Sequence, residues 1–502
     1  IKYKYSNIAL VLTEINLNQE NLLVLESAIS KFKDKDSKST YNRNKLISLK
    51  NDISDLLFNF GLFSFEVNLL EKSIADSDLI EILLEIKSLT PTYINNINIF
   101  GNNRTKDNVI RRELDFNEGD VFNSSLITKS NSSLNSLDIF KRVSIEKENI
   151  NKNLVDVNIF IEEKPTGDFQ IGLSFGSLNG AAFVTGLREK NIGGTGRNVN
   201  LSVNTSSNNT TYSLGVVEPY VFDKKLDMLY GLDYIERDYS TASSYKTNQF
   251  NANFGFKYSI IENMNHSITL SYDLTEYIIT NSSTVASSVD KLSGNNAKFT
   301  LNNRISYNKL NSFIRPTSGY SMSLLNNISP VSNDKDGFIK NTILLKKLLP
   351  VRENIISLQS KIGNITSLQN ESINPDDKFS LGGKWLRGFD SYGAGPRNSK
   401  TSYIGGNNIA VAKVDFIKPL NKNSDSPIDF ILFTDAGFVW DNKIAPNNNK
   451  ESLRASYGTG LRIYSPIGPI GFTWAFPIES ESYDIERMFL FSIGNLNWLI
   501  KN

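Results

Sequence analysis

Between Asp168 and Leu496 the sequence alternates apolar and polar residues with a period of two, and this pattern restricts the fold more than any other feature. We count about sixteen alternating segments of roughly ten residues each, which is typical of a transmembrane β-barrel. Such a sheet must close on itself, because lipid cannot satisfy the backbone groups of an open edge. The sequence therefore predicts an all-β transmembrane barrel of about 16 antiparallel strands over residues 166–502.

A soluble β-sandwich with one wet face is the competing interpretation of this pattern. It is disfavoured because the number of segments exceeds what one sandwich uses. The polar faces also carry charges, which a dry sandwich core could not hold unpaired. These charged positions are Lys413, Asp415, Arg454 and Arg462.

Residues 1–165 instead combine helical and strand patterns, and their order of strand, helix, helix, strand, strand occurs twice. A repeat of about 75 to 90 residues predicts two tandem α+β modules, at residues 1–91 and 92–165. Two unrelated small domains are the alternative interpretation. The patterns predict helices over Tyr41–Phe60, Lys106–Leu114 and Leu126–Phe140, and strands over Phe65–Leu70, Asp78–Ser88, Tyr93–Phe100, Arg142–Glu148 and Asn153–Glu163.

The residue inventory excludes several classes of function. The chain has no cysteine, which excludes disulfides, thiolate metal sites and Cys-His catalysis. Its single histidine, His266, lies in a polar stretch, which favours a solvated or strand-end residue over a catalytic one. The 54 basic and 53 acidic residues nearly cancel to a net charge of +1, and no basic run indicates a nucleic-acid partner. We therefore expect neither an enzyme nor a cofactor or metal site.

The sequence shows no targeting segment. No apolar run reaches the ~18 residues that a membrane helix needs. No signal peptide opens the chain either, which begins Ile1-Lys2-Tyr3-Lys4. Because an exported protein needs such a signal, we expect further sequence upstream of Ile1, with a number of additional modules that this sequence does not reveal.

The second module resembles a POTRA domain. The resemblance rests on Ile97–Asn102, on the helix end Arg111–Leu114 and on Asn117–Asn123. It implies that residues 1–91 form a penultimate POTRA domain and residues 92–165 the last one before the barrel. POTRA domains contact client chains and partner subunits, partly by offering a sheet edge to an incoming strand.

Several blocks in the barrel resemble the BamA family of outer-membrane assembly factors, and with the POTRA motifs they extend over nearly the whole chain. The strongest block is Leu381–Phe389, followed by Gly395-Pro396-Arg397, in a connection of about 40 residues between two strands. The other blocks are Glu218–Phe222, Phe313–Tyr320, Gly405–Asp415 and Phe433–Gly437.

In that family the Arg-Gly-Phe motif lies on a loop that folds back into the barrel lumen, here residues 364–403. The resemblance implies a latch in which acidic residues of the wall hold the arginine, since a guanidinium can bind carboxylates in bidentate fashion. Both matching acidic positions fall on the polar face in our own alternation count, although Asp415 replaces the family's usual glutamate and its contact stays open. The predicted latch residues are Arg387, Gly388, Phe389, Asp415 and Asp435.

The resemblance implies that the protein folds and inserts β-barrel proteins into the bacterial outer membrane without nucleotide, with its POTRA domains in the periplasm. The implied partners are unfolded barrel clients, accessory lipoproteins bound by the POTRA domains, and outer-membrane lipid. The first strand (Asp168–Gly176) and the last (Arg487–Leu496) would form a lateral seam, which their glycines weaken. The predicted seam residues are Phe169, Ile171, Gly172, Leu173, Phe489, Phe491, Ile493 and Gly494.

Two other functions stay open, a two-partner secretion translocator and a passive porin. The translocator also combines POTRA modules with an Arg-Gly-Phe loop, and additional POTRA copies upstream would favour the insertase over it. The POTRA pair argues against a porin.

The C-terminus departs from the family pattern. Family members end with an aromatic residue shortly after the block that matches Phe489–Gly494. Here Asn495–Asn502 follow, and Trp498 is not terminal. The register with which the barrel closes is therefore left open.

Overall fold

The computed structural model divides into two compact units, residues 1–166 with 193–195, and residues 167–192 with 196–502. It describes all residues except 1–3, 14, 16, 37–40, 61, 63–64, 75–78, 89–90, 152, 179, 291–292, 313–314, 331–336, 370–372, 399–401, 422–425, 442–451, 466–467 and 495–502. The first two residues of the Phe313–Tyr320 block, and Trp498 with its neighbours, thus lie outside the described residues. No helix in the described part of the chain is both long and apolar enough to cross a membrane.

The first unit contains two modules with the same topology. In each, the first strand pairs in parallel with the third, and the third pairs antiparallel with the second. The first module comprises β1 (Lys4–Thr13), α1 (Gln19–Asp36), α2 (Arg43–Asn59), β2 (Phe65–Ser73) and β3 (Leu79–Ser88). The second comprises β4 (Tyr93–Phe100), α3 (Asp107–Arg111), α4 (Ser124–Ser136), β5 (Phe140–Asn149) and β6 (Leu154–Glu163).

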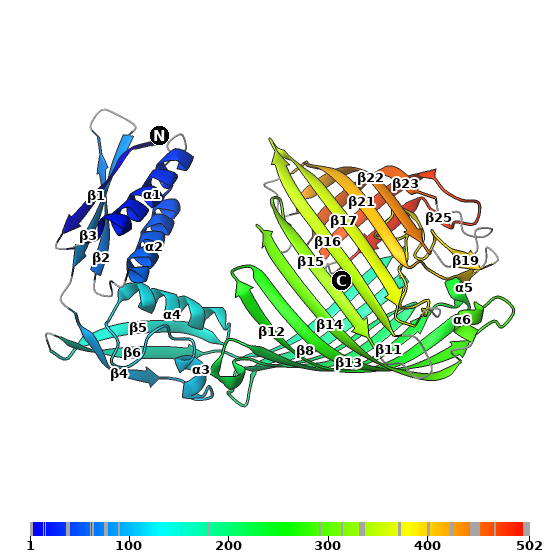
Figure 1. Ribbon diagram of the computed structural model, residues 1–502, viewed down its shortest axis with the longest axis horizontal. Coiled ribbons are helices and arrows are strands. Elements are labelled where there is room, and N and C mark those ends of the chain that lie inside the picture. The colour runs from blue at the N-terminus through cyan, green and yellow to red at the C-terminus, as the bar shows by residue number, and fades with distance from the viewer. Residues whose placement is uncertain are drawn as a thin grey trace. The chain divides into compact units, whose positions relative to one another are not determined.

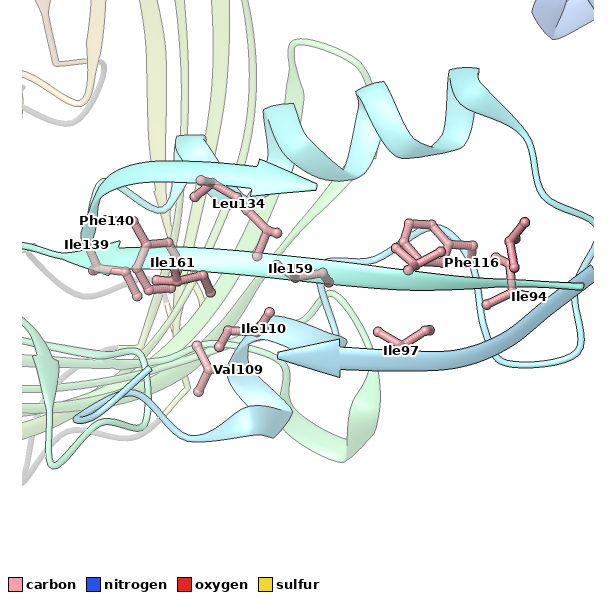
Figure 2. Packing of buried hydrophobic residues seen from close by; sticks show 13 residues of the cluster. Ile94, Ile97, Val109, Ile110, Phe116, Leu134, Ile139, Phe140, Ile159 and Ile161 are labelled. Atoms are coloured by element: carbon pink, nitrogen blue, oxygen red, sulfur yellow. The ribbon is translucent and has the colours of Figure 1, made fainter. Parts of the chain in front are cut away.

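The second module is held together by apolar residues that its helices and sheet bury between them. Val109 and Ile110 of α3, and Leu134 of α4, gather beside Ile159 of β6 (Figure 2). Burying a side chain of this size contributes about 1.5–3 kcal/mol relative to exposure, so the cluster fixes both helices on the sheet. Its members are Ile94, Ile97, Val109, Ile110, Phe116, Leu134, Ile139, Phe140, Val143, Val155, Val157, Ile159 and Ile161.

Three helices differ from the sequence prediction. The helix predicted to reach Phe140 ends at Ser136, because Asp138 adopts a φ of 53° that turns the chain and Phe140 begins β5. The helix predicted over Lys106–Leu114 spans only the five residues of α3. Helix α1 was not predicted, because polar and charged residues dominate it and few apolar positions, such as Leu25, mark its buried face.

The second unit is a barrel in which sixteen antiparallel strands of the described residues close on themselves, which confirms the predicted fold class (Figure 1). Strands that follow each other in the wall are neighbours, and the last wall strand pairs with the first. The wall consists of β7 (Gly167–Gly176), β8 (Gly180–Ile192), β9 (Arg197–Ser206), β10 (Asn209–Glu218), β11 (Asp227–Asp238), β12 (Tyr245–Ile261), β13 (Met264–Ile279), β14 (Gly294–Leu310), β15 (Gly319–Ser329), β16 (Phe338–Val351), β17 (Asn354–Ser367), β21 (Asn408–Pro419), β22 (Ile428–Trp440), β23 (Arg454–Ser465), β24 (Gly468–Glu479) and β26 (Phe489–Ile493).

The connections between wall strands carry shorter elements. The two-residue strands pair with each other, β18 with β25 and β19 with β20. These elements are η1 (Val221–Asp223), α5 (Ser240–Ser243), α6 (Ser287–Asp290), β18 (Gly388–Phe389), β19 (Arg397–Asn398), β20 (Ser402–Tyr403) and β25 (Glu486–Arg487).

Side chains along the wall alternate between an exposed and a buried face. On β22, Leu432 is exposed, whereas Phe433 and Asp435 are buried. The exposed face is rich in large apolar residues, as expected of the face that a membrane barrel turns to lipid. The buried face differs from the prediction, because it is not uniformly polar: Phe433 and Val439 of β22, and Val411 of β21, are also buried there.

We predict that Gly101→Ala destabilises the second module more than Gly119→Ala. Both glycines have a positive φ, so each substitution should cost about 1 kcal/mol from backbone strain. A Cβ at Gly101 would also lie 2.1 Å from the carbonyl oxygen of Ile161, whereas one at Gly119 meets nothing within 4 Å. Hydrogen exchange of the β6 amides in the intact protein measures the difference, and equal losses of protection in both variants would contradict it.

We also predict an acid-sensitive contact at the end of β6. The Glu163 carboxylate accepts the N–H of Arg104 at 3.0 Å and of Thr105 at 2.7 Å. Burial would raise the pKa of Glu163, but the hydrogen bonds from Thr105 and Arg104 outweigh it and lower that pKa. The stability that Glu163 contributes is then present above the unfolded pKa of about 4.3 and is lost as the pH falls through the folded pKa.

A comparison of wild type with Glu163→Gln tests this contact. In urea titrations followed by the helical circular-dichroism signal, wild type should be the more stable at pH 7, and its advantage should shrink below about pH 4.3. If the difference in unfolding free energy between the two proteins stays constant from pH 7 to pH 3, the Glu163 contact is not the source of the stability of wild type.

Candidate functional site

The connection from β17 to β21, residues 368–407, reaches into the barrel, and we name it the lumen loop. The sequence places this loop at 364–403, but β17 continues to Ser367, which pairs with Phe338, and β21 begins only at Asn408. The buried loop residues Leu386 and Phe389 belong to one apolar cluster with inward residues of the wall such as Val411. The loop therefore accounts for the burial of Val411 and Val439, whereas Ile431 and Phe433 of β22 are buried in a second cluster formed with other wall residues.

Arg387 of the lumen loop binds two carboxylates of the wall. Its Nε and Nη2 donate to the two carboxylate oxygens of Asp435 at 2.7 and 2.5 Å, and Nη2 also donates to Asp415 Oδ1 at 2.6 Å. The backbone N–H of Arg387 donates to Asp435 as well, at 3.1 Å. The contact with Asp415, which the sequence leaves open, is thus present despite the shorter side chain.

This group of charges is shielded from solvent. The Asp435 side chain is 0% exposed and that of Arg387 is 13% exposed. The guanidinium lies over the ring of Phe433, 3.6 Å from its centroid, and the Lys413 ammonium lies 3.9 Å from Asp435. A guanidinium can bind carboxylates and stack on an aromatic ring together, which an ammonium cannot do in the same way. Because attraction between buried charges is weakly screened, removing one leaves its partners unpaired at high cost.

The register of β21 and β22 brings the wall members of this group together. Lys413 pairs with Asp435, and Asp415 pairs with Phe433, in neighbouring positions of the antiparallel ladder. Side chains two residues apart on a strand share a face, so the alternation that buries Asp415 also buries Lys413. The alternation along β21 and β22 thus places Lys413, Asp415 and Asp435 together on the inner face, and the lumen loop contributes Arg387.

The two residues after Arg387 explain the rest of the motif. Gly388 has a φ of +94°, and a Cβ there would lie 3.3 Å from the Cβ of Ser456 and 3.5 Å from that of Ala475. A side chain would therefore be strained and crowded against the wall. Phe389 is fully buried in the apolar cluster of the loop.

The barrel closes between β26 and β7 through few contacts. Ser492 pairs with Gly176 and Ile493 with Phe175, while β7 pairs with β8 along its whole length. Ser177 adds two hydrogen bonds of 2.9 Å, its N–H to the carbonyl of Phe491 and its Oγ from the N–H of Phe491. As far as the chain is described, residues 167–174 of β7 have no partner in β26.

Some of the predicted seam residues lie at the contact between β26 and β7, and the others do not. Gly494 lies against β7, where a Cβ would come within 2.4 Å of the carbonyl oxygen of Leu173. Phe489 and Phe491 pair with β24, and Phe491 also exchanges hydrogen bonds with Ser177 across the seam. Of the predicted residues, Phe491, Ile493, Gly494 and Leu173 lie at the seam. As far as the chain is described, Phe169, Ile171 and Gly172 pair with β8 only.

Sequence reasoning missed the contacts that surround the start of the last strand. That strand was predicted from Arg487, but Arg487 belongs to β25, which pairs with β18 of the lumen loop. Arg487 binds Asp390 at 2.8 Å, and Arg454 binds Asp484 at 3.0 Å. The inward charge of Arg454 signalled a buried partner. Periodicity could not identify Asp484, because the connection that carries it has no repeating geometry.

Comparisons with known proteins match both units. The Omp85 superfamily domain model matches residues 191–496, and the POTRA model, described as a surface antigen variable number repeat, matches residues 92–164. The chain is 25% identical to the outer membrane protein assembly factor BamA of Nitratidesulfovibrio vulgaris, over 88% of this chain and 56% of that protein. It is 23% identical to the BamA of Neisseria meningitidis serogroup B, over 90% of this chain and 63% of that protein. The chain thus spans less than two thirds of the length of either relative.

A solved structure shows the same fold. The crystal structure of BamA from Haemophilus ducreyi lacking POTRA domains 1-3 has a TM-score of 0.75 to this chain at 22% identity. The match covers 98% of this chain and 100% of that one. These findings agree with the family resemblance of the sequence motifs.

We predict that Arg387→Ala releases the lumen loop from the wall. Loss of the guanidinium leaves Asp435 and Asp415 buried without it, at a cost of about 3–5 kcal/mol for breaking a buried pair. Arg387→Lys should restore part of the loss, because it keeps the charge but not the bidentate geometry. Limited proteolysis within residues 368–407 measures the release.

The matched control is Arg315→Ala, which removes a comparable pair, Arg315 Nη2 to Asp429 Oδ1 at 2.5 Å, away from the loop. It should leave cleavage of the lumen loop at the wild-type rate. If Arg387→Ala is cleaved no faster than this control, the latch does not hold the loop.

Proposed function

The chain belongs to the Omp85 superfamily, and from this premise we propose that it folds and inserts β-barrel proteins into the bacterial outer membrane. The barrel lies in that membrane, with the POTRA modules in the periplasm. Its relatives are named as assembly factors rather than as enzymes. The observation that carries the proposal is that, within the described part of the chain, β26 pairs with β7 at two positions.

The seam is the part of the wall that separates most easily. Among the residues that the structure describes, ten paired positions join β7 to β8, from Gly167↔Glu189 to Gly176↔Gly180, but two join β7 to β26. An opened β7 would present unpaired N–H and C=O groups to the membrane, where no water can satisfy them. A client strand that adds to this edge satisfies them whatever its side chains are, and client folding supplies the free energy without nucleotide.

The lumen loop keeps the rest of the wall in place while the seam opens. Arg387 holds the loop on β21 and β22 through Asp415 and Asp435. Phe389 packs with Val411 and Val439 in the same cluster, so the loop stiffens this side of the barrel. Opening is thereby confined to the side of β26 and β7.

The POTRA modules suit the capture of clients and accessory lipoproteins. The sheet orders β1-β3-β2 and β4-β6-β5 leave an edge strand on each side of each module. An edge strand accepts an incoming strand through its backbone, which lets one surface serve many partners. Outer-membrane lipid is the third partner, on the apolar outer face of the wall.

Client assembly in liposomes tests the proposal. The full-length protein, with its accessory lipoproteins, is supplied with an unfolded outer-membrane protein, and heat-modifiable folded client is measured. A disulfide between Phe175→Cys and Ile493→Cys should abolish assembly by locking the seam, and reductant should restore it. The chain has no native cysteine, so each single substitution serves as the matched control.

Other outcomes would contradict the lateral route or indicate a different function. Full activity with the seam locked would overturn the lateral route. Secretion of a dedicated exoprotein in place of client assembly would indicate a two-partner secretion translocator. High, unselective conductance would indicate a porin, which the packing of the lumen loop inside the barrel argues against.

A further inference from the structure

The connection from β24 to β26, residues 480–488, leads directly into the strand that closes the barrel, and we name it the seam connector. It is bound to the lumen loop by main-chain contacts. Gly388 pairs with Arg487 and Phe389 with Glu486, in the β18–β25 ladder. The N–H of Asp390 donates to the carbonyl of Ile485, and the N–H of Ile485 to the carbonyl of Gly393, each at 2.9 Å. Arg387, which binds the wall, is thus followed at once by residues that bind the connector.

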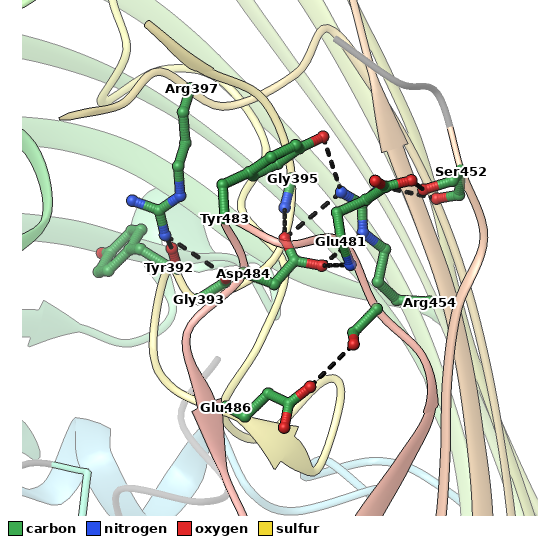
Figure 3. A network of polar contacts seen from close by, with 11 residues as sticks. Tyr392, Gly393, Gly395, Arg397, Ser452, Arg454, Glu481, Tyr483, Asp484 and Glu486 are labelled. Atoms are coloured by element: carbon green, nitrogen blue, oxygen red, sulfur yellow. Dashed lines mark hydrogen bonds and ion pairs between the residues drawn. The ribbon is translucent and has the colours of Figure 1, made fainter. Parts of the chain in front are cut away.

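Asp484 fixes the connector at a buried point. Its carboxylate accepts Arg454 Nε of β23 at 3.0 Å and the N–H of Glu481 at 2.9 Å, and it lies 3.5 Å from the N–H of Gly395 in the lumen loop (Figure 3). Arg454 Nη2 also donates to the hydroxyl of Tyr483. The Arg454 and Asp484 side chains are 1% and 0% exposed. A buried pair with satisfied hydrogen bonds is costly to break, so this end of the connector stays in place.

A second ion pair lies nearer to the last strand and is more accessible. Arg487 Nη2 binds Asp390 Oδ2 at 2.8 Å, and these side chains are 38% and 25% exposed. Water can replace such a pair at small cost. Arg487 stands two positions before Phe489, the first residue of β26. Of these two ion pairs of the connector, the one at Asp484 is a buried anchor, and the one at Arg487, near the start of β26, is the more easily released.

We propose that Asp390 and Asp484 are positioning residues for the last strand, through which the lumen loop sets how β26 meets β7. Within the described residues, two paired positions and the Ser177 contacts hold β26 at the seam, so its placement depends strongly on where it begins. Release of Arg487 from Asp390 loosens the seam, while the Arg454–Asp484 anchor keeps the connector attached. The use of this device in client insertion rests on the proposed function, but the placement of β26 does not.

The test measures the seam without any client. In the full chain, Phe175→Cys and Ile493→Cys place the two thiols at paired positions. The rate of their disulfide formation under a mild oxidant reports how often β26 meets β7. Asp390→Ala should slow it about twofold to fivefold, the factor that a part-exposed ion pair is worth. Asp484→Asn should slow it more, because it weakens the buried anchor.

Charge exchange separates positioning from general loss of structure. Asp390→Arg or Arg487→Asp alone should slow the disulfide, and the two together should restore most of the rate. Arg315→Ala is the matched control, since its pair with Asp429 lies outside the connector and lumen loop, and it should leave the rate unchanged. An unchanged rate in Asp390→Ala, or no rescue by the exchanged pair, would overturn the proposal.

The two proposals fail in distinguishable ways. A protein that assembles no client but shows the slowed and rescued disulfide keeps the positioning role and loses the proposed function. A protein that assembles clients, with a seam insensitive to Asp390→Ala, keeps the function and loses the positioning role.

Discussion

The closed ring of backbone hydrogen bonds is the constraint on which the rest of the barrel depends. Lipid offers no partner for an N–H or C=O group, so each wall strand needs a neighbour on both sides. Among the described residues, β24 pairs with β26 at five positions, whereas β26 pairs with β7 at two. The ring is thus closed, but its strands are not paired equally. The pairing between β26 and β7 is short, and it lies beside the connection that the lumen loop contacts.

The lumen loop resolves a second problem, the charges on the inner face of the wall. Lys413, Asp415 and Asp435 are buried, and a dry interior tolerates such groups only when they are paired. The loop supplies the guanidinium of Arg387 to both carboxylates and the carbonyl of Lys384 to the Lys413 ammonium. The same loop covers inward apolar residues such as Val439, so polar and apolar contacts fix it together.

Much of the fold could be predicted from local patterns. A period of two assigns Asp435 to the inside and Leu432 to the outside from the sequence alone, because successive side chains of a strand point to opposite faces. The Arg-Gly-Phe motif indicated the latch through family resemblance, and the two carboxylates fell on the right face independently. Helix α1 escaped prediction because polar and charged residues dominate it and few apolar positions mark its buried face.

The other misses share one physical cause. Phe433 turns inward, and alternation assigned it there, but the prediction of a polar lumen could not say that a loop would cover it. Arg487 belongs to β25 and not to the last strand. The sequence could not reveal this, because its partner Asp390 is about a hundred positions away in the chain. Such contacts depend on a loop without a repeating geometry, and no local pattern encodes them.

By itself the sequence determined the barrel, the faces of its strands and the inward position of Asp415 and Asp435, because these follow from periodicity over a few neighbouring residues. A repeated order of elements indicated the tandem modules, and the family resemblance implied the latch. Only the tertiary structure decided that Arg387 reaches both carboxylates, that β26 and β7 pair at two positions in the described residues, and that Asp484 and Asp390 pair with Arg454 and Arg487. The physical reason is that closure of a ring and docking of a loop join residues far apart in the chain, whose geometry is set by packing instead of by local conformation.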